Sequence, residues 1–129
     1  MCLEVVTEVK KPVDRTTVID AYKVVRHNYD NRTLQFQCCG FGGDDVVPLD
    51  KWLKAEKDGP ISDDNGKPYS PGFHCFATKK GAEAWNGKFS SYPIIKVKIR
   101  KIRTVGKQGG YKCYVADEMF VPTPDFLKD

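Results

Sequence analysis

The segment IIKVKIRKIRTV, residues 94–105, constrains the fold of this chain more than any other feature. Along it, β-branched residues alternate with cations, which is the period of a β-strand that buries one face and exposes the other. The apolar set is Ile95, Val97 and Ile99, and the cationic set is Lys96, Lys98 and Arg100. A glycine-rich turn and the apolar segment YKCYVADEMFV follow, so we predict an antiparallel hairpin of residues 94–105 with residues 111–121.

Three earlier segments also have the composition of strands. VIDAYKVVRH, which begins at Val18, is rich in β-branched and aromatic residues, and residues 34–39, LQFQCC, have the alternation of a half-buried strand. The polar stretch YDNRT between these two predicts a second hairpin. Residues 73–77 form a short apolar strand, and Thr78 has the side chain to cap a helix in the following KKGAEAW.

The middle of the chain is expected to be less regular. Asp50 has the side chain of an N-cap residue, so KWLKAEK after it predicts one or two helical turns. Residues 58–72 are rich in proline and glycine, which predicts a long central loop. These elements predict an α+β fold: mostly antiparallel sheet with one or two short helices and a long central loop. A length of 129 residues suits a single domain, residues 1–129.

Composition narrows the classes of partner. The formal net charge of +4, from 21 Lys and Arg against 17 Asp and Glu, is low for a dedicated binder of double-stranded DNA. No apolar run approaches the roughly 20 residues of a membrane-spanning helix, and MCLEVVTEVKK is charged where a signal peptide is apolar. We therefore expect a cytoplasmic protein without a membrane partner. The five cysteines lack zinc-site spacing, so we expect reduced thiols and no metal.

The cationic face of residues 94–105 is the first candidate site. Lys96, Lys98 and Arg100 recur at roughly 6.6–7 Å, a spacing that suits the phosphates of a nucleic acid strand. The same basic region extends to Lys107, and rings for stacking on the partner strand are Tyr111 and Tyr114. The alternative is an ordinary solvent face whose lysines protect a sheet edge from aggregation. The sequence leaves both open.

His74 is the second candidate. It alternates with Phe73 and Cys75 in the short strand, so it faces away from them and toward a cleft beside the long loop. There it would face a ligand. The alternative is a structural histidine whose ring nitrogens are satisfied inside the fold.

The block SPGFHCFATKKGAEAW, residues 70–85, resembles the central segment of the ADP-ribosyltransferase fold. The resemblance implies NAD as cofactor, with an aromatic ring, here Phe73, stacked on nicotinamide. It also implies that Tyr22, in AYKVV, grips the NAD ribose and that Glu118, in VADEMFV, is the catalytic glutamate. The catalytic set of such an enzyme is then Tyr22, His74 and Glu118. The alternative is that Phe73 is a core residue and Glu118 a solvated strand terminus.

A broader resemblance spans most of the chain. The opening MCL, the strand YKVV, the segment GFHCF followed by a helix, and VADEM occur here in that order. The combination is similar to a set of small uncharacterised proteins of tailed bacteriophages and some large DNA viruses. It implies the interior of a host cell and an accessory role, in countering a host defence or adjusting host metabolism.

Together these observations lead us to expect a small viral-type accessory protein that binds an anionic partner. The partner is a nucleotide-type ligand or a nucleic-acid backbone, held between residues 58–77 and the basic hairpin. One alternative is an NAD-dependent ADP-ribosyltransferase-like enzyme. The other is an inhibitor that docks on a host protein through a sheet edge or loop.

Overall fold

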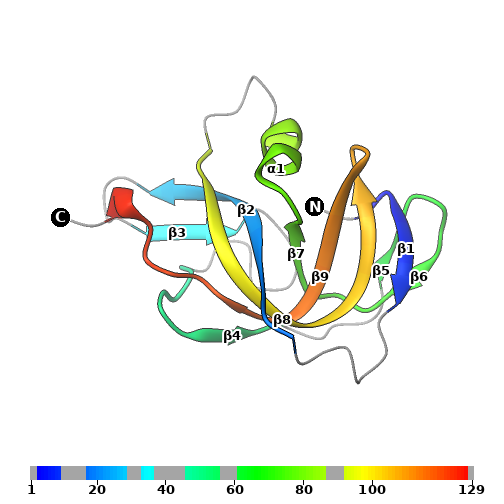
Figure 1. Ribbon diagram of the computed structural model, residues 1–129, viewed down its shortest axis with the longest axis horizontal. Helices are drawn as coiled ribbons and strands as arrows, with labels where there is room; N and C mark the ends of the chain where they lie inside the picture. The colour runs from blue at the N-terminus through cyan, green and yellow to red at the C-terminus, as the bar shows by residue number, and fades with distance from the viewer. Residues whose placement is uncertain are drawn as a thin grey trace.

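The chain folds into a mostly antiparallel sheet with a single short α-helix among its described residues (Figure 1). The computed structural model describes residues 3–9, 17–28, 33–36, 46–55, 61–86 and 92–127. The strands are β1 (Val5–Val9), β2 (Ile19–Asn28), β3 (Thr33–Phe36), β4 (Trp52–Lys54), β5 (Ile61–Ser62), β6 (Pro68–Tyr69), β7 (Phe73–Phe76), β8 (Ile94–Gln108) and β9 (Tyr111–Phe120). The helix is α1 (Lys79–Asn86), and a 3₁₀ turn occupies Asp125–Leu127. The α+β architecture is thus confirmed.

The hairpin that the alternating segment predicts is confirmed as β8 and β9. Gln108 pairs with Tyr111 across a two-residue turn. Gly109 and Gly110 in this turn have φ of 59° and 82°, which glycine adopts without steric cost. The second hairpin is also confirmed, because Val25 to Asn28 of β2 pair with Thr33 to Phe36 of β3. Residues 37–39 of that expected strand lie outside the described residues.

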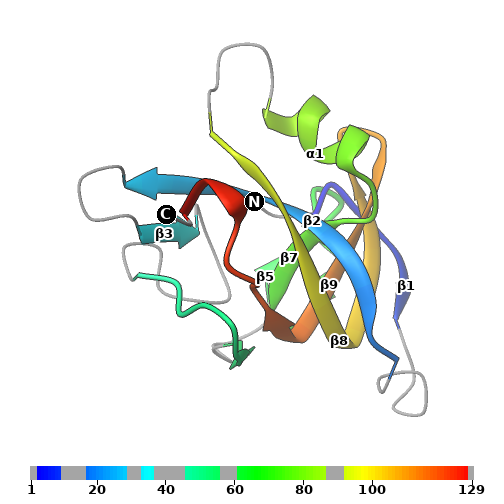
Figure 2. The ribbon, with the colours of Figure 1, turned by 60° about the vertical axis from the view of Figure 1, so that its left-hand side comes forward.

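The sheet curls until its strands form a closed ring. β8 pairs with β2 through its first six residues and with β1 near its end, and β9 follows its other edge. β9 pairs in turn with β7, and β7 meets β2 where Tyr22 opposes Phe76. Figure 1 shows the deep arc of β8 that makes this closure possible, and the turned view of Figure 2 shows the β2–β3 hairpin extending to one side.

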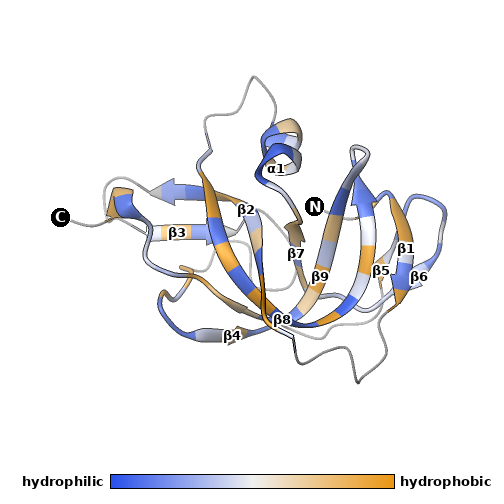
Figure 3. Cartoon of the chain, viewed as in Figure 1, coloured by the Kyte–Doolittle hydropathy of each residue, from blue (hydrophilic) through white to orange (hydrophobic). Residues whose placement is uncertain are grey.

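The arc has a local cause in β8. Figure 3 shows hydrophobic and hydrophilic residues alternating along β8. Ile99 is buried and the next buried residue of the strand is Ile102, so the alternation of burial breaks between them. Lys101 lies at this break with a φ of 57°, a left-handed conformation that costs a non-glycine residue about 1–2 kcal/mol. A second irregularity follows, because the register with β9 shifts between Ile102 and Thr104, so Ile102 and Val105 both join the same core as Ile99.

Two hydrophobic cores result. The inner core fills the ring, and its fully buried members include Ala21, Val25, Phe73, Val97, Ile99 and Met119. The outer core lies between the outside of the sheet and the covering α1, β5, β6 and N-terminal segment. Its buried members include Leu3, Phe76, Ala82, Cys113 and Val115.

The expected α1 is confirmed, and it sits close to the sheet. Thr78 caps it, since its Oγ1 accepts a hydrogen bond from the Gly81 N–H at 3.1 Å. A Cβ at Gly81 would lie 3.0 Å from both Phe76 and Tyr111, so glycine allows the close approach of the helix. Among the described residues, no helix combines the length and the apolar character that crossing a membrane would need.

The prediction of helical turns in KWLKAEK is wrong for the part that the structure describes, residues 51–55. Trp52, Leu53 and Lys54 form β4, which pairs with β9, and Leu53 alone of the three is buried. The segment forms a strand because the edge of β9 offers it a ladder of backbone hydrogen bonds. A short isolated helix has no such stabilisation from a neighbouring element. Asp50 is not an N-cap either: with φ 59°, its carboxylate accepts hydrogen bonds from the Thr123 N–H, at 3.0 Å, and from the Thr123 hydroxyl.

The expected central loop contains a short hairpin in its described part, residues 61–72. Asp63 closes it, because its Oδ1 accepts hydrogen bonds from the N–H groups of Asn65 and Lys67. Its Oδ2 accepts another from Val6 in β1 at 2.9 Å. The Val6 hydrogen bond is the main cause that lowers the pKa of Asp63 below its ordinary value. The segment is therefore anchored to the sheet.

Candidate functional site

A row of cross-strand neighbours on the outer face of the sheet joins cations to aromatic rings. Asp20 of β2 opposes Lys98 of β8, Lys98 opposes Phe120 of β9, and Phe120 opposes Trp52 of β4. Directly opposed residues share one face of a sheet. With the neighbouring rows they form a surface that we name the aromatic–cationic face, made of Trp52, Lys54, Lys96, Lys98, Arg100 and Phe120.

The two rings of this face touch each other and a guanidinium group. The ring centroids of Trp52 and Phe120 are 5.7 Å apart at an interplanar angle of 57°. Arg100 reaches across β9, and its Cζ lies 3.9 Å from the centroid of the Trp52 ring. This is a cation–π contact, and it makes Arg100 part of the same surface as the rings. Both rings are half-buried, so each keeps some area exposed to solvent.

The buried carboxylate of Glu118 forms a hydrogen-bonded ion pair with Arg100 beneath this face. It is 4% exposed, its Oε1 accepts a hydrogen bond from Arg100 Nε at 2.5 Å, and its Oε2 accepts one from Lys101 Nζ at 3.1 Å. Burial by itself would raise the pKa of Glu118, but the hydrogen bonds from the two cations outweigh it and lower the pKa below its ordinary value. Glu118 is thus an ionised acceptor with both oxygens engaged.

The break in β8 is what brings two consecutive cations to one carboxylate. In a regular strand, Arg100 and Lys101 would point to opposite faces. The left-handed conformation of Lys101 removes this alternation, so both side chains reach Glu118. The strained conformation of Lys101 therefore places two positive charges, instead of one, beside the Glu118 carboxylate.

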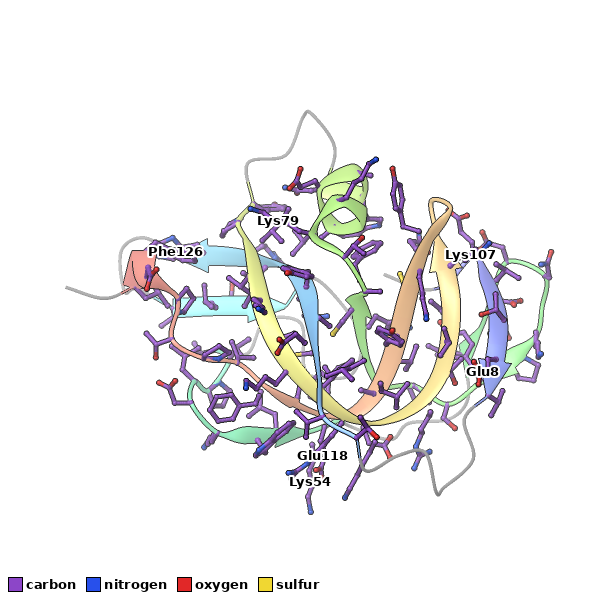
Figure 4. All side chains as sticks on the ribbon, in the orientation of Figure 1. Glu8, Lys54, Lys79, Lys107, Glu118 and Phe126 are labelled. Atoms are coloured by element: carbon purple, nitrogen blue, oxygen red, sulfur yellow. The ribbon has the colours of Figure 1, made fainter. Side chains whose placement is uncertain are left out.

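A pocket lies beside this ion cluster. It has a volume of about 390 Å³, and it is lined by Lys54, Ala55, Lys101, Asp117 and Glu118. Asp117 accepts a hydrogen bond from Arg103 Nε at 2.7 Å. Figure 4 shows Lys54 and Glu118 together at the bottom of the sheet, as expected for directly opposed residues of β4 and β9.

Three of the four cations expected to bind an anion lie on this face. Lys96 and Lys98 are exposed and Arg100 is half-buried. Lys96 Nζ lies 3.5 Å from the carboxylate of Asp20, in a pair whose members are both about half exposed. Lys107 is elsewhere: it opposes Lys112 near the turn of the hairpin, far from Lys54 and Glu118 in Figure 4.

The residues expected to stack on a ligand are not on this face. Tyr111 packs with the outer core near α1, and Tyr114 packs partly against the inner core with Lys112 Nζ 5.2 Å from its ring centroid. Phe73 is 0% exposed in the inner core, so its ring has no solvent-facing side here. Their roles in stacking stay predictions.

His74 is enclosed in a complete hydrogen-bond chain. Its Nδ1 lies 3.0 Å from the Gly72 carbonyl, which can only accept, so Nδ1 carries the proton. Its Nε2 then accepts from the Tyr69 hydroxyl at 3.0 Å, and that hydroxyl accepts from the Leu3 N–H at 3.0 Å. Burial, and next the nearby charge of Lys23, lower the pKa of His74 to about 3. This geometry is that of a neutral structural histidine.

The structure brings two of the three expected catalytic residues near each other. Tyr22 opposes Phe76, two residues from His74 on β7, and it packs partly buried against the outer core. Tyr22 also opposes Lys96, whereas Glu118 opposes Arg100, so Glu118 is displaced by four residues of β8, about 13 Å at the usual strand rise. Glu118 thus lies beneath the aromatic–cationic face, three residues along β9 from Val115, which opposes His74.

The described cysteines and acidic residues offer no metal site. Within the described ranges, His, Cys, Asp and Glu residues form no group of three or more that could hold a metal ion. Burial raises the pKa of Cys75 to about 11 and that of Cys113 to about 12, so both thiols stay protonated at neutral pH. Cys2, Cys38 and Cys39 lie outside the described residues.

Comparison of the chain with protein-family models, with curated proteins and with solved structures found no match. The two resemblances noted in the sequence therefore stay predictions. The candidate site rests on the geometry of the chain itself.

Sequence reasoning missed Trp52, Lys54 and Phe120 as members of the site. The signal was present in KWLK, where Trp52 and Lys54 alternate with the apolar Leu53. Assigning this segment to a helix hid the alternation and with it the aromatic pair.

Proposed function

We propose that this protein binds a phosphorylated ligand that carries an aromatic base, a nucleotide or a single strand of nucleic acid, on the aromatic–cationic face. The observation that carries the proposal is the row of Lys98, Phe120 and Trp52, with Arg100 stacked over Trp52. It sets rings for base stacking directly beside cations for phosphates. These are the two elements that sequence-tolerant binding of single strands combines.

The spacing of the face supports the proposal. Lys96, Lys98 and Arg100 follow one another along β8 at intervals of about 6.6–7 Å, and β9 is about 4.8 Å to the side. A backbone that follows β8 would place its bases over the neighbouring strands, where Phe120 and Trp52 lie. Stacking of one base on such a ring contributes about 1–3 kcal/mol.

The environment of Glu118 favours binding over transferase chemistry. An ADP-ribosyltransferase-like mechanism needs this carboxylate to act on the substrate. Here both of its oxygens accept hydrogen bonds from Arg100 and Lys101, and the group is buried beneath them. Its geometry is that of a residue that positions Arg100.

Calorimetric titration of the purified chain with oligothymidylate of ten residues, ATP and NAD tests the proposal. We expect binding of at least one of them, with an affinity that falls as salt rises, at a log–log slope of about −2 for three phosphate contacts. Lys98→Glu and Trp52→Ala should each weaken binding at least tenfold. The matched control, Lys107→Glu, changes the same charge at the far end of the hairpin and should have a much smaller effect.

Two results would overturn the proposal. One is the absence of binding to all three ligands. The other is binding that survives Lys98→Glu and Trp52→Ala but is lost in Lys107→Glu, since this would place the ligand at the other end of β8.

A further inference from the structure

We infer that the pocket beside Lys101 takes a terminal phosphate, a phosphomonoester, of the ligand that the aromatic–cationic face binds. This inference rests on the proposed function and adds to it the chemical group by which the ligand is held. A strand would then be bound by a phosphorylated end, and a mononucleotide by its phosphate.

The position of the pocket supports this assignment. Glu118 and Lys54, which line it, form the cross-strand row next to the row of Phe120 and Trp52. Adjacent rows on the same face are about 6.6–7 Å apart. The sugar of a single nucleotide bridges such a distance, so a base stacked on the rings would carry its own phosphate to the mouth of the pocket.

The charges around the pocket also fit a phosphomonoester. Two carboxylates there are engaged by cations: Glu118 by Arg100 and Lys101, and Asp117 by Arg103. Lys54 and Lys101 are the cations that line the pocket, and Arg100 and Arg103 bind its two carboxylates from beside it. Among the described residues of this cluster, these four cations and two carboxylates leave an excess of two positive charges. A phosphomonoester carries about −1.5 to −2 at pH 7, whereas a diester carries a single negative charge.

The cations that bind Glu118 keep N–H donors for an incoming phosphate. A lysine ammonium has three N–H donors and an arginine guanidinium has five. In the described contacts, Lys101 gives one hydrogen bond to Glu118 and Arg100 gives one through its Nε. The groups are therefore held in place by the buried carboxylate while most of their N–H bonds stay available to a second anion.

The backbone strain at Lys101 points in the same direction. A non-glycine residue in the left-handed region persists only where its surroundings hold it, and such residues cluster at binding sites. Here the strained conformation directs the Lys101 ammonium to the pocket and to Glu118. A regular strand at this position would remove one of the two lysines from the lining.

The test compares three ligands of identical sequence, oligothymidylates of six residues with a 5′-phosphate, with a 3′-phosphate or with neither, by calorimetric titration of the full chain. We expect one phosphorylated end to bind at least tenfold more tightly than the unphosphorylated strand, and inorganic phosphate to compete with it. Lys101→Gln should abolish this preference while the unphosphorylated strand still binds. Lys54→Gln leaves the ion pairs of Glu118 intact and should reduce the preference even if Lys101→Gln fails to fold.

The matched control is Lys112→Gln, which removes one cation at the far end of the hairpin and should keep the preference. Equal affinity for all three strands, together with loss of binding in Lys98→Glu, would overturn this inference and leave the proposed function standing. No binding of any strand or nucleotide would overturn both.

Discussion

Arg100 lies over the ring of Trp52, with its Cζ 3.9 Å from the ring centroid, although 47 residues separate them in the chain. The contact crosses β9, because Arg100 belongs to β8 and Trp52 to β4. The guanidinium is held at the same time by the buried Glu118. One side chain thus links the edge strand, the ion cluster and the aromatic pair of the candidate site.

A double-mutant cycle measures the contribution of this contact to stability. Arg100→Met and Trp52→Leu each keep an apolar side chain and remove one partner of the cation–π pair. We expect a coupling free energy of about 0.5–1 kcal/mol, since the Arg100 side chain is 35% exposed and the pair is not fully desolvated. Urea unfolding of the four proteins gives the value, and a coupling near zero would mean that the two side chains are merely adjacent.

Replacing Glu118 tests its role as the positioning carboxylate. Glu118→Gln removes the negative charge shared by two ion pairs, and we expect the free energy of unfolding to fall by about 1–3 kcal/mol. The fall is limited because Arg100 and Lys101 are partly exposed and can form hydrogen bonds with water instead. The stability of the variant should also lose the part of its pH dependence that the titration of Glu118 causes. The lowered pKa of Glu118 means that its contribution is fully present above about pH 4.3, the usual glutamate value, and is lost as the pH falls through the folded pKa.

The measurement is urea unfolding at a series of pH values from 3 to 6. The control is Glu83→Gln on the exposed face of α1, which should leave stability within about 0.5 kcal/mol. If Glu118→Gln is as stable as the parent at pH 6 and keeps its acid dependence, Glu118 does not hold Arg100 and Lys101.

Gly106 of β8 lies against the N-terminal segment, opposite Val6 of β1. A Cβ there would be 2.3 Å from the Val5 carbonyl oxygen and 2.7 Å from the Leu3 side chain. The carbonyl belongs to the β1–β8 pairing and cannot move without disturbing that ladder. We therefore expect Gly106→Ala to lower the unfolding free energy by about 1–3 kcal/mol.

Thermal and urea unfolding measure this effect, and hydrogen exchange should show the loss of protection concentrated in β1. Lys107→Ala, at the next position but exposed, is the control and should change stability little. An unchanged Gly106→Ala protein would mean that β1 does not pack against β8 as described.

The sequence predicted the parts of the fold that depend on local alternation. Ile95, Val97 and Ile99 face the inner core and their cationic neighbours face solvent, because a buried face imposes a period of two on any strand. The closed ring was not predictable in this way. It consists of pairings between strands far apart in the chain, and β8 has irregularities at Lys101 and between Ile102 and Thr104. In the sequence, the first of these shows only as two consecutive cations, Arg100 and Lys101.

The candidate site was predicted in part for the same reason. The cations of β8 were found because they share one strand, whereas Trp52 comes from β4, a three-residue strand that exists only through pairing with β9. Tertiary pairing overrode the local helical composition of KWLKAEK. Glu118 was singled out, but its ion pairs with two consecutive residues of β8 need the break in that strand, which no local pattern specifies.

The buried histidine gives the sharpest pH prediction. His74 is 1% exposed and neutral, with its pKa lowered to about 3, whereas an unfolded chain has histidine near 6.5. Between these values the unfolded state binds more protons than the folded state, so stability rises with pH. The contribution of the neutral ring is fully present above about pH 6.5 and is lost progressively as the pH falls toward 3, at no more than about 1.4 kcal/mol per pH unit.

Urea unfolding between pH 5 and 6.5, a window above the carboxylate range, should therefore show the free energy of unfolding rising with pH at a slope that His74→Gln lacks. The variant will be less stable at every pH because Tyr69 and Gly72 lose the ring, so the slope, and not the absolute stability, is the test. The same slope in both proteins would mean that His74 is protonated in the folded state, and the chain through Tyr69 to Leu3 would have to be oriented differently.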